Sequence, residues 1–143
     1  MAKQLTQYRG PLTAEQAAEG ILIARKNASR LLADAEILLQ AGRHASASAL
    51  AILAIEELGK VQIIKTIVLC AEGSSLKQGW KEYRSPRAKN VMWILPKLAA
   101  EGARTMMELQ EATEIDGAHT SMLDTVKQLC LYTDCFNESP RWS

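Results

Sequence analysis

The sequence predicts an all-α fold, an up-and-down bundle of four main helices, and three observations lead to this prediction. Apolar residues recur at three- and four-residue spacing through most of the 143 residues. Capping residues, glycines and prolines stand where these periodic segments begin and end. The length and the 48% hydrophobic content suit one domain, which we place at residues 13–137.

The first helix is predicted over residues 14–41, after residues 1–12, which are polar and are interpreted as a flexible N-terminal tail. Thr13 and Gln16 have the spacing of a capping box, in which each side chain bonds to the backbone amide of the other residue. The apolar residues that follow lie on one face of the helix. Gly42 then supplies a left-handed C-terminal stop.

The second helix, predicted over about 46–70, is apolar on all sides, which is typical of the central helix of a bundle. Its alanine-rich first half favours helix over strand. Residues 73–85 are mostly polar and contain Gly73 and Gly79, so we interpret them as a loop with at most a short helical turn.

The third helix begins at Pro86, because a proline in the first turn lacks only an amide that would have no partner there. Pro96 falls inside its apolar pattern and is expected to kink or split it. Asp116 and Gly117 are predicted to form a turn before a last amphipathic helix over 118–136. Residues 138–143 are interpreted as a C-terminal extension without a polar tail, which suggests a truncated chain.

The charge balance limits the classes of partner. Seventeen Lys and Arg residues oppose sixteen Asp and Glu residues, so any nucleic-acid contact must be local. No apolar run approaches the roughly 18 residues of a membrane span, and the N-terminus lacks the apolar segment of a signal peptide. We therefore predict a cytoplasmic protein with no membrane contact. Three cysteines and two histidines without metal-ligand spacing predict no metal and no cofactor.

The first candidate site is a group of charges inside the most apolar helix. Glu56, Glu57 and Lys60 flank Gly59 there. An unpaired buried carboxylate costs several kcal/mol, so each charge must reach either solvent or a partner. One interpretation is a buried ion-pair network that sets the helix register, and the other is a binding site. Gly59 admits a close neighbour, which is either another helix or a ligand.

A short turn at Gly42 makes the first two helices antiparallel and sets which residues face one another. This register predicts that Glu56 lies beside Arg30 and that Lys60 lies beside Lys26. It also predicts a supporting polar network along the first helix, whose members recur at spacings of three and four, namely Asn27, Arg30 and Asp34.

The second candidate site is a run of cations at the predicted start of the third helix, formed by Arg84, Arg87 and Lys89. Guanidinium groups and free amides at a helix N-terminus bind phosphate. Trp80 and Tyr83 would add surface for base stacking. A solvated basic loop is the alternative interpretation, and no Walker A motif is present.

Several segments together resemble the AbiV family of phage abortive-infection proteins, in the HEPN superfamily of helical bundles. The resemblance covers most of residues 24–136 and is carried by Asn27-Ala28, Leu31-Leu32, Asp34-Ala35, Gly42-Arg43, Glu56-Glu57-Leu58-Gly59-Lys60, Tyr83-Arg84-Ser85 and Leu131-Tyr132-Thr133-Asp134. It implies a homodimeric bundle in antiphage defence.

The same resemblance implies a metal-independent endoribonuclease as one alternative. Such enzymes pair an arginine with a histidine about four to six residues further on. The pair stabilises the phosphorane and moves the proton of the RNA 2′-hydroxyl. No arginine precedes His44 or His119 at that spacing, and Pro86 stands where the family usually has a histidine. The leading hypothesis is therefore binding of RNA, a nucleotide or a phage protein in a charged groove formed by Glu56, Glu57, Lys60, Arg84, Arg87 and Lys89. A non-catalytic oligomerisation module is the remaining alternative.

Overall fold

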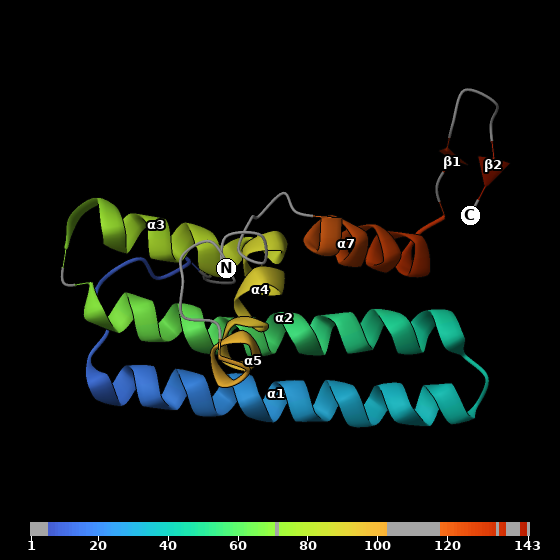
Figure 1. Ribbon diagram of the computed structural model, residues 1–143, viewed down its shortest axis with the longest axis horizontal. Coiled ribbons are helices and arrows are strands. Elements are labelled where there is room, and N and C mark those ends of the chain that lie inside the picture. Colours follow the sequence, from blue (N-terminus) through green and yellow to red (C-terminus); the bar gives the residue numbers. More distant parts are fainter. Residues whose placement is uncertain (1–5, 71, 103–117, 134, 137–140, 143) are drawn as a thin grey trace, which may run out of the picture.

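Two long antiparallel helices, α1 (Ala14–Gln40) and α2 (His44–Leu69), form the body of the molecule in the computed structural model (Figure 1). The structure describes residues 6–70, 72–102, 118–133, 135–136 and 141–142. The predicted capping box is confirmed, because Gln16 N donates to Thr13 Oγ1 while Thr13 N donates to Gln16 Oε1. Gly42, with a φ of 72°, turns the chain between the helices.

The central helix α2 packs against α1, α3, α4 and α7. Ile63 and Ile67 are fully buried, and they form a core cluster with Leu76 and Trp80. This arrangement explains why α2 is apolar all round, whereas α1, among the described helices, packs mainly against α2 and is apolar on that face.

The segment predicted as a loop is instead a helix, α3 (Gly73–Arg84), which lies along the C-terminal half of α2 (Figure 1). Its apolar face recurs at helical spacing, through Leu76, Gly79, Trp80 and Tyr83. Gly79 allows close packing, since a Cβ there would come within 2.7 Å of Ile67 Cγ1. The polar composition and the two glycines concealed this pattern in the sequence.

Residues 6–12, expected to belong to a flexible tail, lie against α3 and are called the N-terminal strap below. Trp80 Nε1 donates to the Gly10 carbonyl at 2.9 Å, and Arg84 Nη2 donates to the Tyr8 carbonyl at 2.7 Å. The Tyr8 ring meets Trp80 edge to face at 5.9 Å, and Leu12 packs against the core cluster. The strap therefore covers one edge of α3.

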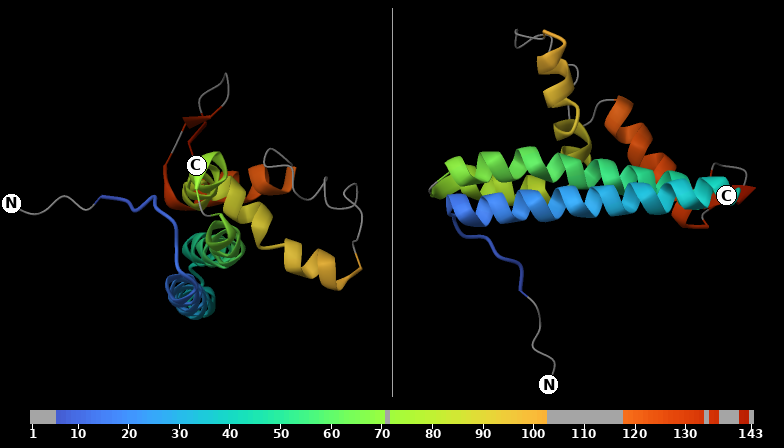
Figure 2. Two further views of the ribbon diagram at one scale, coloured as in Figure 1. Left: turned by 90° about the vertical axis from the view of Figure 1, so that its left-hand side faces the viewer. Right: turned by 90° about the horizontal axis from the view of Figure 1, so that it is seen from below.

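The predicted third helix consists of two short helices, α4 (Pro86–Met92) and α5 (Leu95–Ala100). Ser85 Oγ caps α4 by accepting from Ala88 N at 3.2 Å. Pro96 lies in the first turn of α5, where its missing amide costs no helical hydrogen bond. Figure 2 shows α5 projecting away from the α1–α2 hairpin. The fold is helical, but the described chain is divided into more and shorter helices than the four main helices that the sequence predicts.

The last described helix, α7 (Ala118–Leu131), packs against α2 and α4. The prediction that it continues to residue 136 is wrong. Strand β1 (Cys135–Phe136) pairs antiparallel with β2 (Arg141–Trp142), and each strand contains one aromatic residue, a type that favours extended backbone. The predicted turn at Asp116–Gly117 lies outside the described residues. Among the described helices, none has both the length and the apolarity needed to cross a membrane.

Candidate functional site

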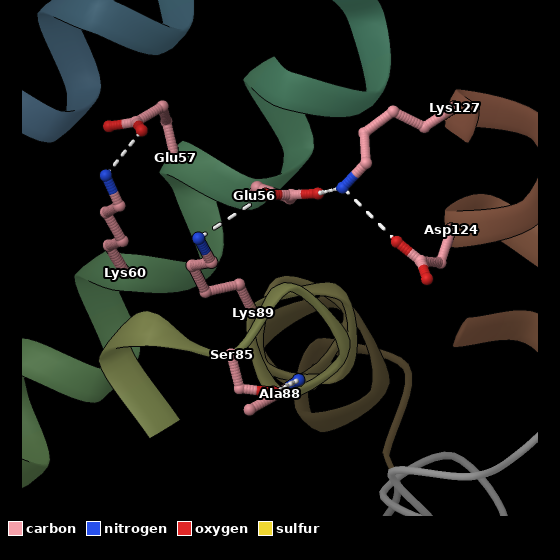
Figure 3. A network of polar contacts seen from close by, with 8 residues as sticks. All are labelled: Glu56, Glu57, Lys60, Ser85, Ala88, Lys89, Asp124 and Lys127. Atoms are coloured by element: carbon pink, nitrogen blue, oxygen red, sulfur yellow. Dashed lines mark hydrogen bonds and ion pairs between the residues drawn. The ribbon is translucent and has the colours of Figure 1, made fainter. Parts of the chain in front are cut away.

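Glu56 and Glu57 are consecutive residues in α2, and they point to different sides of the helix (Figure 3). Successive side chains on an α-helix diverge by about 100°. Glu56 therefore faces α4 and α7, whereas Glu57 faces the side of α2 that borders α1. The prediction that Glu56 lies beside Arg30 is wrong for this reason, because Glu56 takes its partners from the opposite side.

Glu56 is the centre of a buried ion-pair network that we call the Glu56 cluster (Glu56, Lys89, Asp124 and Lys127; Figure 3). Lys127 Nζ lies 2.5 Å from Glu56 Oε1 and 3.3 Å from Asp124 Oδ1, while Lys89 Nζ lies 3.4 Å from Glu56 Oε2. The Glu56 and Lys127 side chains are only 6% and 8% exposed. Two carboxylates thus balance two ammonium groups.

Lys127 is the member of this cluster that sequence reasoning missed. Burial alone would lower the pKa of its ammonium group, but the hydrogen bonds and charges of Glu56 and Asp124 outweigh burial and raise the pKa above its usual value. A signal was present in the sequence. Lys127 occupies the helical face of Leu123 and Cys130, a position where a lone charge requires a buried partner.

Gly59 resolves the choice between a neighbouring helix and a ligand in favour of the helix. A Cβ at Gly59 would overlap the carbonyl oxygen of Lys89 and come within 2.7 Å of its carbonyl carbon. The backbone of α4 can therefore lie directly on α2 only because residue 59 has no side chain. This contact brings Lys89 within reach of Glu56, so the glycine and the ion pair act together to seat α4.

On the other side of α2, Lys60 Nζ pairs with Glu57 Oε1 at 2.5 Å and lies 5.3 Å from the centre of the Tyr83 ring. These residues border a hollow of about 610 Å³, which we call the α1–α2 groove. Lys26 and Lys60 both line it, as the predicted register requires. Its lining residues are Gly20, Ile23, Ala24, Lys26, Asn27, Arg30, Glu57, Lys60 and Tyr83.

The predicted polar network of α1 continues from this groove onto the exposed surface. Arg30 Nη2 donates to Asn27 Oδ1 at 2.8 Å, and Arg30 Nη1 donates to Asp34 Oδ2 at 3.1 Å. Asn27 and Arg30 line the groove, but Asp34 does not. The network therefore orients the Arg30 guanidinium at the rim, and Glu57 is the carboxylate that faces the three cations of the groove.

A second hollow of about 330 Å³, the strap hollow, adjoins the first and shares Lys60 and Tyr83 with it. The strap hollow also brings together Arg84 and Lys89, which lie far from Lys60 in the sequence. Its lining residues are Gln7, Tyr8, Lys60, Trp80, Tyr83, Arg84 and Lys89.

Not every residue of the second candidate site meets there. Arg87 is exposed and lines neither hollow. Trp80 was expected to stack on bases, but although it lines the strap hollow the residue is only 9% exposed and belongs to the core cluster. Tyr83 is half-buried and borders both hollows, so one of the two predicted aromatic surfaces is available.

Both hollows are lined by several cations, so their chemistry suits an anionic ligand. Arginine forks and lysine ammonium groups are the usual protein donors to phosphate oxygens. Neither histidine of the chain lines either hollow, and the His119 ring instead lies 6.3 Å from that of Trp93. In the described part of the chain, no three His, Cys, Asp or Glu side chains are grouped as metal ligands.

The fold and the site define an all-helical domain built on a long antiparallel hairpin, with a charged groove along that hairpin. The chain belongs to the AbiV family within the HEPN group, because the model of that family matches residues 16–143. This membership indicates a role in abortive infection, an antiphage response. Searches of curated proteins and of solved structures find no significant match.

Proposed function

We propose that the protein acts in abortive infection in the bacterial cytoplasm by binding RNA through its phosphates in the α1–α2 groove. The observation that carries this proposal is the charge of the groove, whose described lining has three cations, Lys26, Arg30 and Lys60, and one carboxylate, Glu57, while Asp34 pairs with Arg30 at the rim. A groove with excess positive charge attracts a polyanion even though the whole chain is nearly neutral.

The carboxylates next to the groove support this proposal because they orient its cations. Glu57 holds the Lys60 ammonium, and Glu56 holds Lys89 at the edge of the strap hollow. Arg84 adds a guanidinium to the same hollow. An ammonium group held in place loses less side-chain entropy when it binds phosphate. Pairing with a carboxylate weakens each cation somewhat, so the expected affinity is moderate.

We also propose that the protein is a homodimer, and exposed apolar side chains support this part of the proposal. Leu32, Ile37 and Leu39 on α1 are at least half exposed, and Met122 and Leu129 on α7 are 57% and 43% exposed. Leu32 and Leu39 line one largely apolar hollow together with Ala35, Ala47 and Ala51, and contiguous apolar surface marks interfaces between subunits. Equilibrium sedimentation at micromolar concentration should give the mass of two chains, and the mass of one chain would contradict the dimer.

The RNA proposal is tested by fluorescence anisotropy with a labelled single-stranded RNA over a series of salt concentrations. The variant K26A/K60A removes two groove cations, and K65A is its matched control because Lys65 is an exposed cation of α2 outside the groove. Each phosphate contact on a single strand contributes about 0.7 to the slope of log affinity against log salt. The double variant should therefore reduce the slope by about 1.4, with no change for K65A.

Two outcomes would contradict this proposal. A salt slope near zero for the wild-type protein would exclude phosphate contacts as the basis of binding, and a capture experiment with phage proteins would then test the alternative partner. Equal salt slopes for the wild type and K26A/K60A would show that the phosphate contacts lie outside the groove. Gel analysis of the same RNA tests the endoribonuclease alternative, which requires cleavage that K26A/K60A reduces.

A further inference from the structure

A third hollow, of about 480 Å³, lies between the N-terminal strap and α3, and we call it the α3 cleft. Among the residues that the structure describes, its lining carries four cations and no carboxylate, and these lining residues are Arg9, Lys77, Trp80, Lys81 and Arg84. No carboxylate of the described ranges forms an ion pair with Arg9, Lys77 or Lys81. The α3 cleft is therefore more strongly positive than the α1–α2 groove.

The cations of α3 form a straight row on one helical face. Lys77, Lys81 and Arg84 stand at positions i, i+4 and i+7, which spreads them over about 10 Å of helix. Like charges at i and i+4 repel and destabilise a helix, so an anion in the cleft would relieve this repulsion. Glu82 does not compensate the row, because it accepts a hydrogen bond from Gln78 at 2.9 Å and lines none of the three hollows.

Shared residues join the α3 cleft to the other two hollows. The cleft shares Trp80 and Arg84 with the strap hollow, which in turn shares Lys60 and Tyr83 with the α1–α2 groove. Arg84 is held at the junction, since Nη1 donates to the Trp80 carbonyl at 2.8 Å and Nη2 donates to the Tyr8 carbonyl. Its guanidinium carbon also lies 5.5 Å from the Trp80 ring centre.

We propose that the α3 cleft extends the RNA groove, so that the ligand is a single strand of several nucleotides that follows all three hollows. This inference rests on the proposed function. A mononucleotide can occupy one hollow, whereas an RNA backbone presents one phosphate per nucleotide along the whole row of cations. Tyr83 borders two of the hollows and offers a ring on which an unpaired base can stack. A duplex would hide its bases from that ring.

The test compares two ligands, an oligouridylate of about 12 nucleotides, within the usual range of single-strand site sizes, and uridine triphosphate. The variant K77A/K81A removes two cleft cations, and K65A/K97A is its matched control because these exposed lysines lie outside all three hollows. For the oligouridylate, we expect K77A/K81A to reduce the salt slope by about 1.4, with no change in the control. We expect the affinity for uridine triphosphate to stay unchanged in K77A/K81A.

The remaining outcomes separate this inference from the proposed function. If K26A/K60A weakens oligouridylate binding but K77A/K81A does not, the α3 cleft is not part of the binding site. This outcome overturns the extension but supports RNA binding in the α1–α2 groove. If K77A/K81A weakens both ligands equally, the cleft is a mononucleotide site and the extension is again overturned. If the wild-type protein binds neither ligand, the proposed function fails together with the extension. Unfolding curves for each variant check that the exposed substitutions leave the fold intact.

Discussion

Glu56 and Glu57 occupy adjacent positions in α2, yet their surroundings differ in charge balance and in access to solvent. Glu56 meets Lys89 and Lys127 in a buried network that contains as many carboxylates as ammonium groups. Glu57 meets Lys60 at a groove where cations outnumber it. A balanced and buried cluster stabilises the packing of helices, whereas a part-buried group with excess positive charge at a groove fits the proposed binding of an anionic ligand.

Removing a carboxylate should also reduce the free energy of unfolding by different amounts on the two sides of α2. Removing one partner of a buried ion pair leaves the other charge without compensation in a medium of low dielectric constant. The Glu57–Lys60 pair is part-buried, with side chains 16% and 19% exposed, so removing Glu57 leaves an ammonium group that water in the groove can partly solvate. The run from Glu56 to Lys60 therefore combines a structural side and a proposed binding side within about one helical turn, and three predictions test this division.

The largest effect is expected from E56Q, which leaves Lys89 and Lys127 facing a neutral amide. Breaking a buried pair from one side costs about 3–5 kcal/mol, and we expect a decrease of this size in the free energy of unfolding, measured by urea denaturation. The matched control is E57Q, which removes the neighbouring carboxylate of a part-buried pair and should cost less, about 1–3 kcal/mol. Equal losses for the two variants would show that the two sides of α2 do not differ.

A smaller loss is expected from G59A, because the added methyl group overlaps the Lys89 carbonyl and forces α4 away from α2. Overpacking of this kind costs about 1–3 kcal/mol. The matched control is G20A, on α1, where the one described atom that the new Cβ would meet is Ile64 Cδ1, at 3.4 Å. Alanine is the better helix former, so G20A should stabilise the protein by up to about 1 kcal/mol. Thermal unfolding of both variants measures the difference, and a stabilising G59A would contradict the close seating of α4.

The most gradual change in the free energy of unfolding is expected at alkaline pH, where Lys127 loses its proton. Its pKa is higher in the folded protein than in the unfolded chain, where it is about 10.4, because Glu56 and Asp124 favour the charged form. The resulting stabilisation is complete below the unfolded pKa and is lost as the pH rises through the folded pKa. The stability difference between wild type and K127M should therefore shrink as the pH rises through that interval. A difference that stays constant would exclude this linkage, and K97M, at an exposed pair, is the control.

The long hairpin could be predicted closely from the sequence. The capping box at Thr13, the turn at Gly42 and the apolar face of α1 are all encoded by residues that are near one another in the chain. The register that places Lys60 beside Lys26 follows from the shortness of that turn. The helix α3 was missed, although its apolar residues have helical spacing, because two glycines and a polar composition resemble a loop.

The candidate site could be predicted only in part. The sequence indicated that Glu56, Glu57 and Lys60 need partners, and it indicated cations at Arg84 and Lys89. It did not indicate that Lys127, 71 residues further along, is the partner of Glu56. It also did not indicate that the strap would dock on Arg84 and Trp80.

The sequence by itself determined the helical class, the central position of α2, the capping of α1 and membership of the AbiV family. Each of these depends on local spacing, composition or motif. Only the tertiary structure decided which charge is buried and which faces a groove. Helical periodicity places Glu56 and Glu57 on different sides of α2, but it does not say which helix covers each side. That choice depends on the contact of α4 with Gly59 and on the packing of α7, and both join segments distant in the chain.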